Sequence, residues 1–152
     1  MTIEFDCIVA GISCVDLLIG PLNLDQPLNQ EGTWALDTIT PTVGGNVSNS
    51  SIALARLGSR TAALSLAGTD EWGGFLISKL QDEGVNTSRF QQREGLDTSA
   101  TAVLMNSKLE HIFAYKPGAS EAIDRSLIDD NLDFIAQSKY LLLGYYGLLP
   151  NI

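Results

Sequence analysis

The fold is best predicted from the stretch Val43-Gly44-Gly45-Asn46-Val47-Ser48-Asn49-Ser50-Ser51-Ile52-Ala53-Leu54-Ala55-Arg56-Leu57-Gly58. Its apolar residues after Ser51 are typical of a helix, and Gly58 suits the position just past a helix end. The paired glycines let the backbone approach a ligand closely, and the free N–H groups of the helix start point to the same place. The stretch therefore predicts a ligand site, with a ligand-free glycine turn capped by Asn or Ser as the alternative.

Asn46 and Asn49 are the side chains of this stretch that best suit a ligand. Each amide offers both donors and acceptors. A spacing of three residues places the two side chains near one face of the first helical turn. Such a pair suits a neutral, hydroxyl-rich ligand. A phosphate-binding loop is excluded, because no Gly-Lys-Ser/Thr sequence follows at the required spacing.

Around this stretch, short apolar strands alternate with helices, which is the pattern of a parallel α/β sheet. Continuous runs of aliphatic residues predict strands that are buried on both faces. We expect these strands at 5–11, 61–68 and 140–144. We expect helices over 46–57, 71–83 and 127–136, with Asp70 as the N-cap of the second.

Two further regions alternate between apolar and polar residues and predict a small antiparallel sheet with one solvated face. These are a strand at 34–42 and a hairpin at 98–116 that turns at Asn106-Ser107-Lys108. The segment 20–32 contains Pro and Gly without periodicity and reads as a loop. The chain ends shortly after the strand at 140–144. We therefore expect the N-terminal portion of one α/β domain, truncated at about its middle and carrying a β appendage.

Asp16 follows the first predicted strand after a short gap. Open α/β sheets bind ligands just beyond the carboxyl ends of their strands. A carboxylate there can accept hydrogen bonds from two adjacent sugar hydroxyls, and a charged acceptor binds more strongly than a neutral one. Asp16 is therefore a second candidate ligand residue, and the alternative is an aspartate that caps a turn.

The composition narrows the class of partner. The 152 residues include 9 basic and 18 acidic side chains, giving a net charge of −9, which argues against nucleic acid. No run approaches the roughly 18 apolar residues of a membrane span, and no basic leader begins the chain. Cys7 and Cys14 form no metal or disulfide pattern and fit a reducing cytoplasm as small buried residues. The single histidine, His111, is expected at the surface.

Four segments occur in the order and at the spacing of a known family signature. They are Gly11-Ile12-Ser13-Cys14-Val15-Asp16, the Gly44–Gly58 stretch, Ala67-Gly68-Thr69-Asp70-Glu71-Trp72-Gly73, and Asp97-Thr98-Ser99 with the strand that follows. Together they resemble the N-terminal half of the PfkB, or ribokinase-like, carbohydrate kinases. The resemblance covers nearly the whole chain.

The resemblance implies a doubly wound α/β domain with a β-sheet lid, here formed by about 12–43 and 98–116, that closes over a sugar. It implies transfer of the γ-phosphoryl group of ATP to a sugar hydroxyl with the help of Mg²⁺. In the family, such lids often pair between subunits, so a homodimer through the lid sheet is suggested. The residues that the resemblance assigns to the sugar are Asp16, Gly44, Gly45, Asn46, Asn49 and Gly118.

The family's catalytic aspartate lies in a Gly-Ala-Gly-Asp segment that this sequence lacks. The nearest run, Gly118-Ala119-Ser120, has no aspartate, so no residue is assigned a catalytic role and no metal ligand is assigned. The leading hypothesis is the sugar-binding portion of a sugar kinase. A non-enzymatic sugar-binding or sensing module and an assembly fragment with a purely structural glycine turn are the alternatives.

Overall fold

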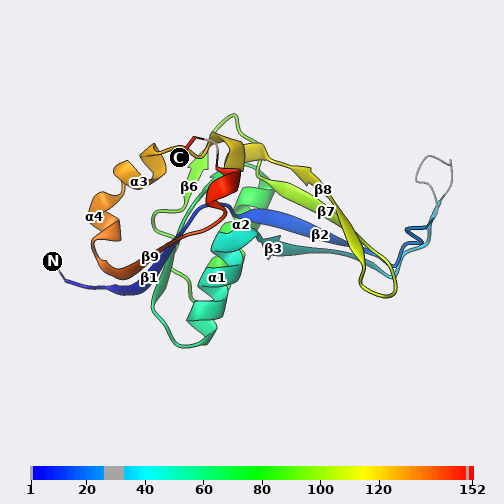
Figure 1. Cartoon of the computed structure of the whole chain (residues 1–152), viewed down its shortest axis with the longest axis horizontal. Helices are drawn as coiled ribbons and strands as arrows, with labels where there is room; N and C mark the ends of the chain where they lie inside the picture. Colours follow the sequence, from blue (N-terminus) through cyan, green and yellow to red (C-terminus); the bar gives the residue numbers. More distant parts are fainter. Residues whose placement is uncertain (1, 26–32, 150) are drawn as a thin grey trace.

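The first sheet is parallel and has helices on both faces (Figure 1). The computed structural model describes residues 2–25, 33–149 and 151–152. The strand order is β4-β1-β9, with β1 in the centre. The strands are β1 (Phe5–Ala10), β4 (Thr61–Leu64) and β9 (Ser138–Leu143).

Two hydrophobic cores lie on the two faces of this sheet. Ile8 belongs to the core that includes Leu127 and Phe134, whereas Val9 belongs to the core that includes Val47 and Leu80. Adjacent strand residues point to opposite faces, so both faces of β1 are covered. The predicted doubly wound α/β fold is confirmed. The helices are α1 (Gly45–Arg56) and α2 (Glu71–Asp82) on one face, and α3 (Ser126–Asp129) and α4 (Leu132–Ile135) on the other.

A second, four-stranded sheet, which we call the outer sheet, extends away from the α/β layers in Figure 1. Its order is β3-β2-β7-β8, in which β2 and β7 are parallel and the other neighbours are antiparallel. The predicted hairpin at 98–116 is confirmed as β7 and β8. The strands are β2 (Cys14–Gly20), β3 (Thr38–Gly44), β7 (Ala100–Met105) and β8 (His111–Lys116).

Strand β2 was not predicted, and Asp16 lies within it rather than in a loop after the first strand. Gly11 has φ of +126° and redirects the chain directly after β1, so a new strand begins within a few residues. The expected strand at 34–42 is shifted to 38–44, because β3 pairs along the full length of β2. Of the expected loop at 20–32, Gly20 ends β2 and residues 26–32 lie outside the described part of the chain.

The expected strand at 61–68 is divided at Ser65, whose hydroxyl donates to the Gly11 carbonyl at 2.7 Å. The second piece, β5 (Leu66–Gly68), pairs with β6 (Gln91–Arg93) in a separate small sheet. The expected helix at 127–136 is two short helices. The Asn131 amide between them donates to the Leu127 carbonyl at 3.0 Å, so this polar side chain competes with a continuous helix.

The last predicted strand, at 140–144, was expected to be buried, but within these 152 residues β9 is an edge strand and is largely exposed. Tyr140 is 72% exposed and Leu142 is 41% exposed. An apolar run alone cannot tell an edge strand from a central one, because burial depends on the neighbours. Two 3-10 turns complete the described elements: η1 (Gly118–Ala122) and η2 (Tyr146–Leu148). Among the helices described, none has the length and apolarity needed to cross a membrane.

Candidate functional site

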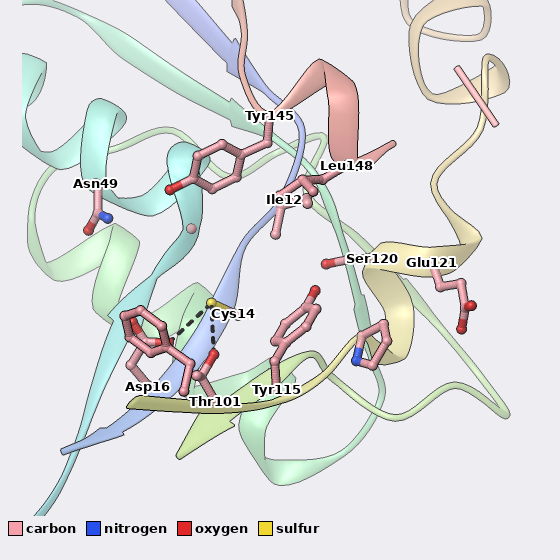
Figure 2. Close-up of a pocket in the computed structure, with 13 residues that line it drawn as sticks. Ile12, Cys14, Asp16, Asn49, Thr101, Tyr115, Ser120, Glu121, Tyr145 and Leu148 are labelled. Carbon is pink, nitrogen blue, oxygen red and sulfur yellow. Dashed lines mark hydrogen bonds between the residues drawn. The ribbon is translucent and has the colours of Figure 1, made fainter. Parts of the chain in front are cut away.

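A cavity of about 630 Å³ opens where the outer sheet meets α1 and the C-terminal turn (Figure 2). Its wall combines apolar and aromatic side chains with a few polar groups, which is the usual composition of a small-molecule site. The lining residues are Ile12, Cys14, Asp16, Gly45, Asn49, Thr101, Phe113, Tyr115, Pro117, Ser120, Glu121, Tyr145 and Leu148.

Asp16 is half-buried on β2 and is held by its neighbours. Its Oδ1 accepts a hydrogen bond from the Cys14 thiol at 3.3 Å, and Thr101 Oγ1 donates to the Cys14 sulfur at 4.0 Å (Figure 2). A side chain at Gly44, on the neighbouring strand β3, would overlap the Asp16 carboxylate. The position of Asp16 therefore depends on a thiol on its own strand and on a glycine beside it.

The pKa values of two groups in this wall, Cys14 and Tyr115, are raised. Burial, reinforced by the neighbouring Asp16 carboxylate, raises the pKa of the Cys14 thiol to about 12. Cys14 therefore remains an S–H donor at neutral pH. Burial also raises the pKa of the Tyr115 phenol, against a hydrogen bond with Ser120 that lowers it. Both groups keep their protons, so both can act as hydrogen-bond donors.

The start of α1 forms the wall opposite β8. Gly45 has φ of +81°, and a Cβ there would lie 2.5 Å from the Ile12 carbonyl oxygen, so glycine is required twice over. The Val47 N–H donates to that same oxygen at 3.0 Å, which fixes the first turn against the chain leaving β1. One turn later, Asn49 is exposed and lines the cavity.

Asn46 points elsewhere, although it is three residues from Asn49. Its Oδ1 accepts from the Ile12 N–H at 3.0 Å and its Nδ2 donates to the Ala10 carbonyl at 3.1 Å. Its side chain leaves no room for a side chain at Gly144. Asn46 thus binds the backbone between the end of β1 and the start of the outer sheet, and it does not line the cavity.

Of the six sugar-binding residues predicted from the sequence, the structure brings Asp16, Gly45 and Asn49 together at the cavity. Gly44 lies behind Asp16 and clears space for its carboxylate. Gly118 has φ of +51°, and a Cβ there would lie 2.5 Å from the Asp97 carbonyl oxygen, so it shapes the turn next to the lining residue Pro117.

Several lining residues were not predicted. Thr101 and Tyr115 are paired across β7 and β8, and Thr101 is also paired with Asp16 across β2. This row becomes visible only when the strand register is known. Tyr145 has φ of +56°, a rare conformation for a residue other than glycine, and its ring extends toward Asn49 in Figure 2. No local sequence pattern marks such a residue.

Comparison with known proteins finds similarity to carbohydrate kinases over nearly the whole chain. The family profile described as "pfkB family carbohydrate kinase" matches residues 9–151. The 5-dehydro-2-deoxygluconokinase of Clostridium tetani is 28% identical over 90% of this chain and 39% of that protein. The 5-dehydro-2-deoxygluconokinase 2 of Bacillus cereus is 30% identical over 91% of this chain and 40% of that protein.

Solved structures share the fold. The Arabidopsis thaliana ribokinase complexed with ribose and ATP superposes with a TM-score of 0.75 at 22% identity, over 94% of this chain and 45% of that one. The chain therefore spans less than half the length of the relatives that it matches. Because the family profile covers nearly all of the sequence, the chain belongs to the pfkB family of carbohydrate kinases.

Proposed function

We propose that this chain forms the acceptor-binding part of an ATP-dependent carbohydrate kinase, which transfers the γ-phosphoryl group of ATP to a sugar hydroxyl. The observation that carries the proposal is the meeting of Asp16, Asn49 and Gly45 in one cavity. The three come from β2 and the start of α1. A carboxylate and an amide beside apolar walls suit a ligand that has many hydroxyl groups on an apolar frame.

The other predicted sugar residues take different parts in this proposal. Gly44 lets Asp16 occupy its position, and Gly118 sets the turn beside Pro117. Asn46 supports the site by joining α1 to the end of β1 rather than by touching the sugar. The names of the relatives suggest two acceptor classes, a gluconate derivative and neutral sugars such as ribose.

ATP and Mg²⁺ complete the proposed reaction. The solved relatives include a ribokinase complexed with ATP. Among the residues that the structure describes, no group of three or more His, Cys, Asp or Glu side chains could hold a metal ion. No step is therefore assigned to Mg²⁺ on this chain. We expect 1–152 alone to lack kinase activity, because the sequence lacks the Gly-Ala-Gly-Asp segment that carries the catalytic aspartate in the family that it resembles. The contribution of these residues is to bind and orient the acceptor and to exclude water from it.

The outer sheet fits the role of a lid, built from about 12–43 and 98–116. Its strands β2, β7 and β8 supply Asp16, Thr101 and Tyr115 to the cavity. It projects from the α/β layers (Figure 1) and joins them through residues 11–13, through the direct passage from β3 to α1 at Gly44 and Gly45, and through Pro117. Movement about these connections would open and close the cavity, as lids do in enzymes that sequester a substrate.

The far face of the outer sheet fits a second copy of the chain. A row of four aliphatic side chains crosses all four strands in register: Ile39, Ile19, Leu104 and Ile112. Ile39 is 68% exposed and Ile112 is 49% exposed. An apolar face of this extent is typical of an interaction surface. We propose that the protein forms a homodimer through this face and that it is cytoplasmic. Light scattering of Ile39→Lys compared with wild type tests the homodimer.

The kinase activity is tested with protein expressed from its complete coding region. ATP-dependent ADP release is measured over a panel of aldoses, ketoses, aldonates and nucleosides, with isolated 1–152 in parallel. The proposal expects transfer to one acceptor class, with no transfer by 1–152. If the folded protein binds a sugar but never releases ADP, the sugar-sensing alternative replaces the kinase.

A further inference from the structure

The charges around the cavity differ from what an anionic acceptor requires. Asp16 and Glu121 contribute two carboxylates to the lining. The sequence has 9 lysine and arginine residues. All of them lie in the described part of the chain, and none lines the cavity. A carboxylate or phosphate on a bound ligand would therefore meet two like charges with no opposite charge from these residues.

The nearest basic residue along the chain points away from the cavity. Lys116 follows Tyr115 on β8, and neighbouring strand residues lie on opposite faces of a sheet. Tyr115 lines the cavity, whereas Lys116 Nζ is paired with the Asp97 carboxylate at 2.5 Å. The Lys116 side chain therefore lies on the face of β8 that points away from the cavity, and its ammonium group is paired with the Asp97 carboxylate.

A neighbouring cavity of about 460 Å³ shares Asn49 and contains Arg56 and Lys79. Arg56 donates two hydrogen bonds to Glu83, at 2.7 and 2.5 Å. Lys79 lies against the ring of Phe75, with its Nζ 5.8 Å from the ring centroid. These two cations line the neighbouring cavity rather than the first one, and the Arg56 guanidinium is paired with Glu83.

The hydrogen-bonding groups of the cavity also favour a neutral ligand over an anionic one. Ionised Asp16 and Glu121 can only accept hydrogen bonds. Three of the nearby hydroxyls are engaged, since Thr101 donates to Cys14 and the Ser99 and Ser120 hydroxyls are 2.6 Å apart. The other donors of the lining are neutral ones, the Asn49 amide and the Tyr115 and Tyr145 phenols, so two carboxylate acceptors face the ligand without a charged donor, and a ligand that brings O–H groups complements them better than one that brings a carboxylate.

The remaining walls are apolar. Phe113, Tyr115 and Tyr145 contribute aromatic rings, and Ile12 and Leu148 contribute aliphatic side chains. These surfaces suit the C–H faces of a sugar ring, and the polar groups that they carry, the Tyr115 and Tyr145 phenols, are neutral.

From these charges, donors and walls we propose that the acceptor is a neutral sugar and that the cavity discriminates against sugar acids and sugar phosphates. The inference rests on the proposed function and narrows it to one substrate class. Glu121 is the residue of this chain that we test for this choice, because it lines the cavity from η1, where it is exposed, and forms none of the ion pairs found among the described residues.

The test compares matched pairs of pyranoses that keep the ring and differ only at C6: D-glucose and D-glucuronate, D-galactose and D-galacturonate, D-mannose and D-mannuronate. Protein from the complete coding region is titrated with each by calorimetry, and ADP release is measured with ATP. We expect a neutral member to bind and react, and its acid partner to bind about tenfold more weakly or worse. Equal or tighter binding of the acid partner overturns the inference and leaves the kinase intact. Failure of the folded protein to bind or phosphorylate any member of the wider panel of aldoses, ketoses, aldonates and nucleosides contradicts the kinase itself.

A charge reversal shows whether the cavity is the cause. Glu121→Lys should narrow the preference for the neutral member by about tenfold, because it replaces a like charge with an opposite one. Asp82→Lys makes the same change in net charge at an exposed position on α2, outside the cavity. We expect this control to keep the wild-type preference. An unchanged preference in Glu121→Lys overturns the assignment to the cavity charges.

Discussion

At the residue scale, the candidate site depends on small groups that surround one carboxylate. Asp16 occupies its position because Gly44 has no side chain and because the Cys14 thiol donates to it. A thiol is a weak donor and is compatible with burial among apolar residues. Cys14 was expected to be a small buried residue, which is confirmed, but its place beside Asp16 depends on the β2 strand that local pattern did not show.

Cys14 makes stability sensitive to alkaline pH. Its thiol pKa is about 12 in the folded protein, whereas an unfolded thiol ionises near pH 8.5. The folded state therefore holds this proton more tightly. The resulting stability is complete below about pH 8.5 and is lost as pH rises toward 12. Between pH 7 and pH 10, we expect the free energy of unfolding to fall by about 2 kcal/mol more in wild type than in Cys14→Ser.

Urea unfolding at the two pH values measures this difference. Cys7, whose thiol pKa is also raised by burial, is present in both proteins and cancels. Identical pH dependence in wild type and Cys14→Ser would show that the Cys14 thiol is not buried beside Asp16.

At the element scale, Asp70 joins α2 to the start of β7. Its Oδ1 accepts from the Gly73 N–H at 2.9 Å, and its Oδ2 accepts from the Thr98 N–H at 2.8 Å. The predicted N-cap is therefore confirmed, and the same carboxylate also holds the entry to the outer sheet. Burial opposes its ionisation, but hydrogen bonds from Thr98 and Gly73 outweigh burial and lower the pKa of Asp70.

We expect Asp70→Ala to lower the free energy of unfolding by about 3 kcal/mol at pH 7, since it removes an N-cap and hydrogen bonds to a charged group. Because the folded pKa is lowered, this contribution is present above the unfolded pKa of about 3.9 and is lost as pH falls further. Denaturant unfolding at pH 7 and pH 3 measures both effects. Asp82→Ala, at the other end of α2, serves as the control, and an equal small effect of both variants would contradict the role of Asp70.

The outer sheet should be the least protected element. Every residue of β8 is exposed, whereas β1 is almost entirely buried. Segments with little buried apolar contact open most readily. We expect amide hydrogens of 98–116 to exchange faster than those of 5–10 and 61–64, and the acceptor sugar to slow them. Hydrogen exchange with mass spectrometry measures this. Equal, strong protection of all three segments without sugar would mean that the outer sheet is fixed.

The elements also show how far sequence patterns reach. The buried strand β1, the helices α1 and α2 and the β7–β8 hairpin were predicted, because each carries a strong local period or a clear cap. Strand β2 was missed because its start depends on the backbone turn at Gly11, and the exposure of β9 was missed because burial depends on neighbouring strands. Pairing and burial are properties of the assembled sheet rather than of the segment.

At the scale of the whole molecule, the cavity is assembled from both sheets and from segments more than a hundred residues apart, such as Ile12 and Leu148. The glycine-rich start of α1 and Asp16 could be predicted as site residues because their chemistry is local. Thr101, Tyr115, Glu121 and Tyr145 could not, because only strand register and chain folding bring them to Asp16. The family resemblance pointed to Asp16 and the start of α1 but to none of Thr101, Tyr115, Glu121 and Tyr145.

We propose that Asp16 binds the acceptor in this cavity, and calorimetric titration measures the strength of this contact. Protein from the complete coding region is titrated with the acceptor that it phosphorylates, as wild type, Asp16→Asn and Asp37→Asn. Asp37 is exposed before β3, does not line the cavity and provides the same chemical change. A hydrogen bond to a charged group contributes about 1.5–3 kcal/mol. We therefore predict that Asp16→Asn binds the acceptor about tenfold to a hundredfold more weakly, with unchanged unfolding, while Asp37→Asn binds as wild type does. Wild-type affinity in Asp16→Asn would show that Asp16 does not bind the acceptor.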